Sequence, residues 1–171
     1  DRNNGRDNRD VIALIGSDVY NHTYQKAINY KNGEYGIGQL ASTEMLEVTG
    51  GNYTVVNGEE GRAWQRMLVE IDGKQVAIYN THLSLGVGDA FRSNVSEILE
   101  VLENDPVPYK LLTGDFNATR ENMDAFKEKY NLSNGKDGLW YSTFEGDKYA
   151  SGAGYIDGAP NADIESGIDN I

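Results

Sequence analysis

Polar residues with reactive side chains follow two apolar strands of the predicted fold. The segment Tyr109–Thr119 runs from an apolar strand into a small turn that carries Asp115 and Asn117. Upstream, Val76–Ser84 has the same arrangement and ends near His82, one of only 2 histidines. Two strand ends of this kind are expected to form two walls of one active site.

These side chains suit the metal-assisted hydrolysis of a phosphoester. That reaction needs an oriented water, a hard cation held by carboxylates, and donors aimed at the phosphoryl oxygens. Asp115 can act as the base, Asn117 as an amide donor and His82 as an imidazole donor. Asp169, near the end of the chain, supplies a second carboxylate. Taken singly, each has an ordinary explanation in a turn or at a strand end, and only the combination favours an active site.

The composition indicates one ordered globular domain. The chain has 171 residues, 39% of them hydrophobic, with 11 Tyr, 2 Trp and 4 Phe. This length is enough for one domain with a sizeable core. The net charge of -12 repels nucleic acid and anionic membranes at long range. Nucleic acid is therefore possible as a substrate but is not favoured by charge.

Cysteine usage and hydropathy limit the reactions that the chain can carry out, but they do not determine its cellular compartment. Zero cysteines exclude disulfides, thiolate metal sites and cysteine nucleophiles. No apolar run has the length of a transmembrane segment, so we expect a soluble chain, with a secreted or cell-surface location left open. One of five Asn-x-Ser/Thr sequons would place a glycan at Asn117, inside the predicted site, which favours a bacterial source without N-glycosylation.

Periodicity and turn residues predict a mixed fold in which strands outnumber helices. In the first part we expect a helix at Val11–Ile15 stopped by Gly16, strands at Val19–Tyr30 and Tyr35–Ser42 joined by the turn Asn32-Gly33, a strand at Met45–Val56 broken at Gly50-Gly51, and strands Ala63–Ile71 and Lys74–Tyr79 joined by the turn Asp72-Gly73. His22 is expected to be an ordinary strand residue. In the second part we expect an amphipathic helix at Asp89–Glu103, a strand at Tyr109–Thr113, a second helix at Asn122–Tyr130, a short strand at Leu139–Phe144, a loop at Glu145–Gly167 and the start of a strand at Ile168–Ile171.

Five short motifs, in this order and spacing, resemble those of the endonuclease/exonuclease/phosphatase superfamily, which has the deoxyribonuclease I-like fold. The most specific is Gly114-Asp115-Phe116-Asn117-Ala118. The others are Tyr35-Gly36-Ile37 with Leu40 and Ser42, Asn80-Thr81-His82-Leu83, Thr143-Phe144, and Ile168-Asp169-Asn170-Ile171. Asn170 is a mild departure, since the family often has His or Tyr there.

The resemblance implies an α/β (α+β) fold: a four-layer sandwich of two packed mixed or antiparallel β-sheets flanked by helices. It implies a divalent-metal-dependent hydrolase acting on a phosphodiester or phosphomonoester, with Mg2+ (magnesium), or else Mn2+ or Ca2+, as cofactor. The substrate class stays open among nucleic acid, a lipid head group and a small phosphoester. Carried over by resemblance, Asp115 orients or deprotonates the attacking water, His82 and Asn117 bind phosphoryl oxygens, and Asp169 acts beside them.

Three further residues are candidates for substrate binding. Tyr35 lies in the early strand motif, and Arg92 matches a recurrent arginine at the start of the helix after His82. Arg62 resembles the arginine of an E-x-R sequence before the next strand, with Arg66 as the competing alignment. For Arg92, a salt bridge on the helix surface explains the residue equally well.

Two family segments have no counterpart between Asp1 and Ile171. The resemblance places the metal-binding Q-E pair, with the main Glu ligand, before Asp1, and the S-D-H motif with its catalytic histidine after Ile171. We therefore expect residues 1–171 to be a single domain that is incomplete at both ends. A non-catalytic binding module that retains the fold is the alternative, and a carbohydrate-binding β-rich domain is a more distant one.

Overall fold

The computed structural model describes residues 1–5, 8–16, 18–118, 122 and 125, and the backbone of residues 155–156, 159–160 and 169–170. The helices predicted around Val11 and Asp89 are present as α1 (Val11–Gly16) and α2 (Asp89–Asn104). The predicted strand Leu139–Phe144 and most of the predicted helix Asn122–Tyr130 lie outside the described residues. In the part that is described, no helix is both long enough and apolar enough to span a bilayer.

Two strands close to the N-terminus form an antiparallel hairpin, β1 (Asn21–Tyr30) and β2 (Gly33–Ala41). The turn lies one residue earlier than predicted, at Lys31 and Asn32, because Gly33 already pairs with Tyr30. Lys31 takes the left-handed φ of 51° that closes the turn. His22 is an exposed residue of β1, as expected.

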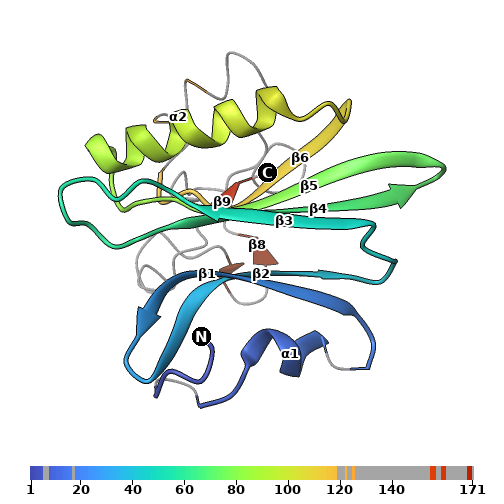
Figure 1. The fold of residues 1–171 in the computed structure, drawn as a ribbon, viewed down its shortest axis with the longest axis horizontal. Helices are drawn as coiled ribbons and strands as arrows, with labels where there is room; N and C mark the ends of the chain where they lie inside the picture. The colour runs from blue at the N-terminus through green and yellow to red at the C-terminus, as the bar shows by residue number, and fades with distance from the viewer. Residues whose placement is uncertain are drawn as a thin grey trace.

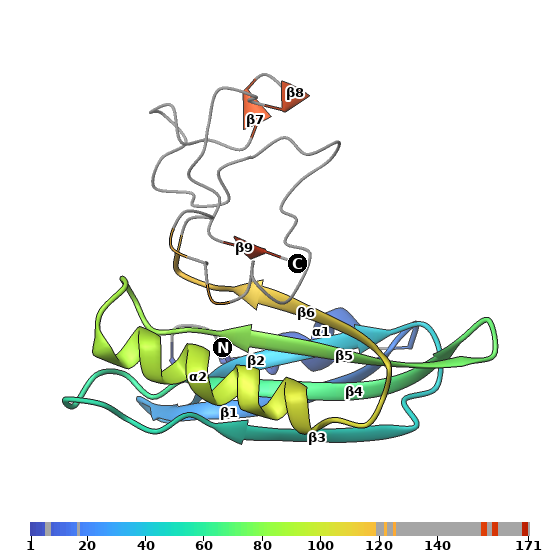
Figure 2. The same ribbon diagram turned by 90° about the horizontal axis from the view of Figure 1, so that it is seen from above.

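The second sheet has five strands in the order β3-β4-β5-β6-β9. Its strands are β3 (Glu47–Asn52), β4 (Ala63–Ile71), β5 (Lys74–His82), β6 (Tyr109–Asp115) and β9 (Asp169–Asn170). All neighbours are antiparallel except β5 and β6, which are parallel and are connected through α2. Figure 2 shows β3 at one edge of this sheet and β9 at the other, with α2 lying roughly along the strands.

Local sequence explains the β4–β5 hairpin. Asp72 and Gly73 have φ values of 50° and 72°, which is the two-residue geometry that suits the twist of a tight hairpin. The turn is as predicted, and β5 extends three residues beyond Tyr79 to include His82.

The predicted break at Gly50-Gly51 is wrong. β3 continues through both glycines, which pair with Gln65 and Trp64 of β4. A Cβ atom at Gly51 would lie 3.1 Å from Trp64 Nε1, so the glycine makes room for the indole rather than ending the strand. In the stretch predicted as the loop Glu145–Gly167, two short strands pair as β7 (Tyr155–Ile156) and β8 (Ala159–Pro160).

The elements stack in four layers, which Figure 1 shows from α2 at the top through the five-stranded sheet and the β1–β2 hairpin to α1 at the bottom. The predicted four-layer α/β sandwich is confirmed. β4 lies between β3 and β5, and its side chains alternate between the two faces of the sheet. Leu68 belongs to the core under α2, whereas Met67 and Val69 pack toward the hairpin side with Ala41.

Most of the core lies between α2 and the five-stranded sheet. Helical spacing directs an apolar stripe of α2 onto the sheet. Its buried members are Ala90, Phe91, Val95, Ile98 and Leu102. They meet Tyr79 and Leu83 from the β5 segment and Phe116 from the end of β6. Packing around the carboxyl ends of β5 and β6 therefore fixes the two strand ends that carry the predicted site.

Candidate active site

His82 and Asp115 lie opposite each other at the carboxyl ends of β5 and β6. Parallel strands end at the same edge of a sheet, so a register that pairs their last residues brings these side chains together. His82 Nε2 lies 3.6 Å from Asp115 Oδ2. The Leu83 N–H donates to the Asp115 carbonyl at 2.9 Å, which holds the two strand ends together beyond the last ladder pair.

Gly114 permits this close approach of the two strands. Its φ of 137° is outside the range that residues with a Cβ adopt readily. A Cβ atom built at this position would overlap the backbone oxygen of Thr81 on β5. The glycine of the motif is therefore needed for the contact between β5 and β6.

Tyr35 and Arg62 both contact the ring of His82. The Tyr35 hydroxyl, from β2, lies 3.2 Å from His82 Nδ1. Arg62 precedes β4, and its Nη1 lies 3.2 Å from His82 Nδ1 and 3.0 Å from His82 Nε2. A guanidinium has no acceptor, so the ring nitrogen that takes its hydrogen bond carries a lone pair. The structure thus brings two of the three candidate substrate-binding residues to His82.

Arg62 is a buried cation at the centre of this group. The residue is 5% exposed, and its ion-pair partner is Glu60, whose Oε1 lies 3.0 Å from Arg62 Nη1. Arg62 Nε is buried and unpaired among the described residues. A buried cation with unused donors is a strong attractor for an anionic ligand oxygen.

Burial raises the pKa of Asp115 above its ordinary value. Two contacts oppose this effect, namely the hydrogen bond from the Asn117 backbone N–H and the positive charge of Arg62. The Asn117 N–H donates to Asp115 Oδ1 at 2.9 Å, while Oδ2 faces His82. The two oxygens therefore differ: one is fixed in the turn and the other faces the site.

Asn117 joins the two turns of the site. It has a left-handed φ of 49°, which asparagine tolerates better than most residues. Its side-chain Nδ2 donates to the Leu83 carbonyl at 2.8 Å. At least one of its amide hydrogens thus serves the scaffold, and the role of Asn117 as a donor to phosphoryl oxygens stays a prediction.

The backbone of β9 brings Asp169 to the same edge of the sheet. Asp169 pairs with Asp115, and Asn170 with Gly114, in an antiparallel ladder. Two residues of the predicted strand at Ile168–Ile171 are therefore present as β9 beside β6, and the role of Asp169 as a second carboxylate stays a prediction.

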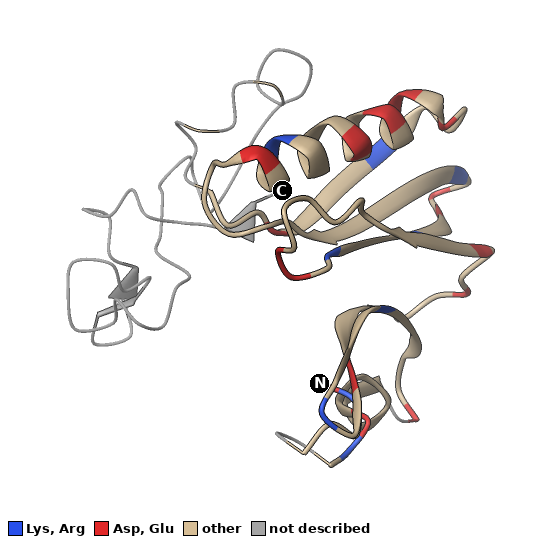
Figure 3. Ribbon diagram, turned by 60° about the vertical axis from the view of Figure 1, so that its left-hand side comes forward, with Lys and Arg blue, Asp and Glu red and all other residues tan. Residues whose placement is uncertain are grey.

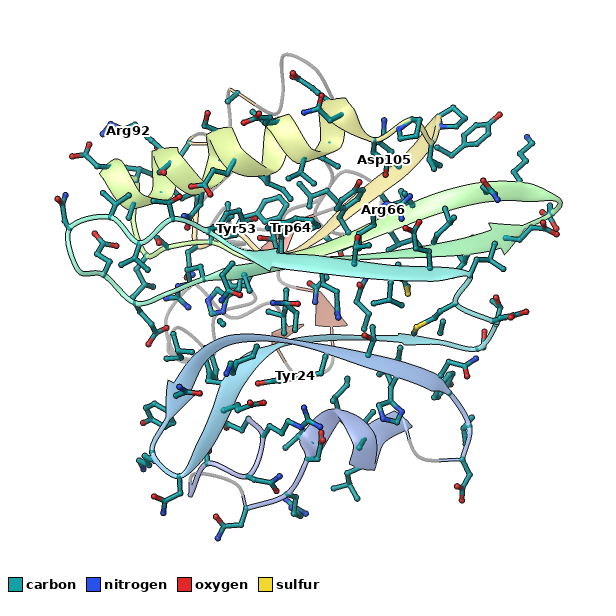
Figure 4. The ribbon with its side chains drawn as sticks, viewed as in Figure 1. Tyr24, Tyr53, Trp64, Arg66, Arg92 and Asp105 are labelled. Carbon is teal, nitrogen blue, oxygen red and sulfur yellow. The ribbon has the colours of Figure 1, made fainter. Side chains whose placement is uncertain are left out.

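Arg92 and Arg66 lie away from His82. Arg92 is exposed on α2 and lines a separate hollow of about 360 Å³ with Phe91 and Val95. Figure 4 shows Arg92 at the outer surface near the start of α2, and Arg66 pointing toward Asp105 between the sheet and the helix. Arg66 Nε lies 2.8 Å from Asp105 Oδ2, so Arg66 has a structural partner. Of the two competing arginines, Arg62 is the one that contacts His82.

Sequence reasoning missed two supports of the site. Tyr53, after β3, is buried and its hydroxyl lies 2.6 Å from Thr81 Oγ1, next to His82. Glu60 is the glutamate of the E-x-R sequence that ends at Arg62, but it was not itself a candidate. Its spacing of two residues from Arg62 was a usable signal, whereas nothing local in the sequence pairs Tyr53 with Thr81.

The described residues do not by themselves form a metal site. No group of three His, Asp or Glu side chains among them could hold an ion. Asp115 offers one carboxylate, but the neighbouring cation Arg62 disfavours a second positive charge. Binding of Mg2+ stays a prediction.

The four layers and the strand-end site define the endonuclease/exonuclease/phosphatase fold, the deoxyribonuclease I-like class. An endonuclease/exonuclease/phosphatase family protein from Leptotrichia buccalis is similar at 16% identity and a TM-score of 0.58, covering 90% of this chain and 60% of that one. A mannosyl-6-phosphatase from Bacteroides thetaiotaomicron is similar at 16% identity and a TM-score of 0.63, covering 90% and 62%. The human Nocturnin catalytic domain is similar at 18% identity and a TM-score of 0.53, covering 72% and 54%.

These similarities confirm the resemblance at the level of the fold. The chain spans less than two thirds of the length of each of these three structures. No family model matches the sequence, and no curated protein is significantly similar to it.

Proposed function

We propose that this protein hydrolyses phosphoesters at the edge of the sheet where β5 and β6 end. One observation carries the proposal: buried Arg62 contacts His82, and His82 faces Asp115 across the parallel strand ends. A buried cation, an imidazole and a carboxylate at one point are the groups that stabilise and attack a phosphoryl centre.

Each group has a role that its surroundings support. Arg62 and His82 bind the non-bridging phosphoryl oxygens through N–H donors. Asp115 accepts a proton from the attacking water, whose oxygen forms a bond to phosphorus as the ester P–O bond breaks. A raised pKa makes Asp115 a stronger base than an ordinary aspartate. The departing alkoxide takes up a proton to leave as the alcohol.

We also propose that hydrolysis requires a divalent metal, Mg2+ or else Mn2+ or Ca2+. The support is the family resemblance rather than the described residues, of which only Asp115 is a candidate ligand. Asp169 remains a proposed second acid, supported by its place in β9 beside Asp115.

We favour a small phosphoester or a lipid head group as substrate over nucleic acid. The net charge of -12 opposes the long-range attraction on which binding of a polyanion depends. Helix α2, which flanks the site after His82, carries four acidic residues and one arginine. Figure 3 shows these acidic positions along the helix.

Hydrolysis of two chromogenic esters tests the proposal. The full-length protein is incubated with bis-para-nitrophenyl phosphate, a diester, and para-nitrophenyl phosphate, a monoester, in Mg2+, Mn2+, Ca2+ or EDTA. We expect release of para-nitrophenol with at least one metal and none in EDTA. Protein that is inert in every metal would support the alternative of a binding module that retains the fold. Activity that persists in EDTA would contradict the metal requirement alone.

A further inference from the structure

Glu60 contacts the same nitrogen of Arg62 that contacts His82. Arg62 Nη1 lies 3.0 Å from Glu60 Oε1 and 3.0 Å from His82 Nε2. This nitrogen carries two hydrogens at fixed angles in the plane of the guanidinium. The Glu60 carboxylate therefore attracts the guanidinium at the same nitrogen that contacts the ring of His82.

We infer that Glu60 is a positioning residue: its ion pair with Arg62 Nη1 holds the guanidinium against the ring of His82. The inference deepens, and for its kinetic consequence rests on, the proposed phosphoester hydrolysis. Glu60 itself lies in the loop before β4, and its side chain is 47% exposed, whereas that of Arg62 is 6% exposed. Glu60 thus acts from the protein surface on the buried guanidinium of Arg62.

Three elements hold the His82 ring from different sides. Tyr35 of β2 contacts Nδ1, Arg62 before β4 contacts both ring nitrogens, and Asp115 of β6 faces Nε2 at 3.6 Å. Of these contacts, the one from Arg62 depends on an arginine side chain with several rotatable bonds. Glu60 is its ion-pair partner among the described residues, which is why loss of Glu60 releases the guanidinium.

The neighbouring residue Glu59 provides a matched control. It has the same side chain in the same exposed loop, and its described contact is a backbone hydrogen bond from its N–H to the Val56 carbonyl. Glu59→Ala therefore removes one carboxylate from the loop and leaves the Arg62 contact in place.

Imidazole resonances report the position of the ring directly. The chain has 2 histidines, so His22→Gln leaves His82 as the single ring signal. In that background, nitrogen NMR of the full-length protein is compared between Glu60→Ala, Glu60→Gln and Glu59→Ala. We expect Glu60→Ala and Glu60→Gln to shift the His82 ring nitrogens, because both remove the charge that pairs with Arg62, and Glu59→Ala to have no effect.

Kinetics then separate positioning from a general loss of stability. We expect Glu60→Ala to lower kcat/KM for bis-para-nitrophenyl phosphate about fivefold, with thermal unfolding unchanged, since an ion pair with a half-exposed partner is worth up to about that factor. A His82 ring signal that is the same in Glu60→Ala and Glu59→Ala would overturn the inference. So would a wild-type ring signal in Glu60→Gln, which lacks the charge of the ion pair. The ring signal decides the matter even if the wild type hydrolyses neither ester, which would overturn only the proposed function.

Discussion

Asp115 combines two requirements that conflict at the scale of the single residue. Its carboxyl group is held in a turn by the Asn117 N–H and faces His82, which suits catalysis. Its partial burial raises the pKa, so the folded protein disfavours the ionised form. Activity is thus expected to come at the expense of stability at this position.

The consequence for stability has a defined sign. The folded pKa is above the unfolded one, so the folded protein holds more protons between the two values and loses stability as the pH rises through that window. We expect Asp115→Asn to raise the unfolding temperature at pH 7, because asparagine keeps an oxygen for the Asn117 N–H and carries no charge. The gain should vanish below about pH 4, where an ordinary aspartate is protonated.

Circular dichroism melts from pH 3 to 8 measure this effect. Asp72→Asn in the exposed β4–β5 turn is the control, with no pH-dependent gain expected. A variant at position 115 that is less stable than the wild type at pH 7 would contradict the account of Asp115.

At the scale of elements, contact between β5 and β6 depends on Gly114. Gly58 also has a positive φ, 75° against 137° at Gly114, but a Cβ atom there would meet nothing within 4 Å. We expect Gly58→Ala to cost about 1 kcal/mol from backbone strain alone. Gly114→Ala should cost several-fold more and abolish hydrolysis, because the strands must separate. Chemical denaturation of both variants measures the difference, and equal losses would show that the close approach is not required.

A network of hydrogen bonds around Asp105 connects the end of α2 to the sheet. Burial alone would raise the pKa of Asp105, but hydrogen bonds from Arg66, Tyr79 and the Val107 N–H lower it to about 2. Because the folded value is below the unfolded one, the network stabilises the protein above about pH 4, and this contribution is lost as the pH falls toward 2. Figure 4 shows Arg66 and Asp105 facing each other under α2.

Breaking this network should destabilise the fold without altering the groups at the site. Asp105 and Arg66 have side chains that are 4% and 9% exposed, so removing one leaves a buried charge. We expect Asp105→Ala to cost about 3–5 kcal/mol at pH 7. The exposed Glu100→Ala on α2 should cost less than about 0.5 kcal/mol. Urea denaturation gives both values, and similar losses would contradict a stabilising role for the network.

At the scale of the whole molecule, local patterns predicted most of the fold. Hairpin turns at Asp72-Gly73, the helical spacing in Asp89–Glu103 and apolar strands each have a short-range cause. The mistaken break at Gly50-Gly51 shows the limit, because those glycines are explained by Trp64 on the neighbouring strand rather than by their own segment.

The closeness of His82 and Asp115 was predictable because both residues stand at the ends of neighbouring strands. The sequence could not decide whether Arg62 or Arg66 is the arginine of the site, since the two are four residues apart and close to the same strand. Arg62 stands just before β4 begins, so the alternation of the strand does not set its direction, and only the fold shows that it contacts His82. Glu60 was missed because its contact depends on that direction.

Loss of activity on removal of His82 tests the central claim most directly. His22→Ala is the matched control, since His22 is exposed on β1 and distant from β5 in sequence. In hydrolysis of bis-para-nitrophenyl phosphate by the full-length protein, we predict that His82→Ala and Asp115→Ala each lower the rate by about 100-fold or more, with His22→Ala unchanged. Full rates in either site variant would contradict the assignment of this strand-end cluster as the active site.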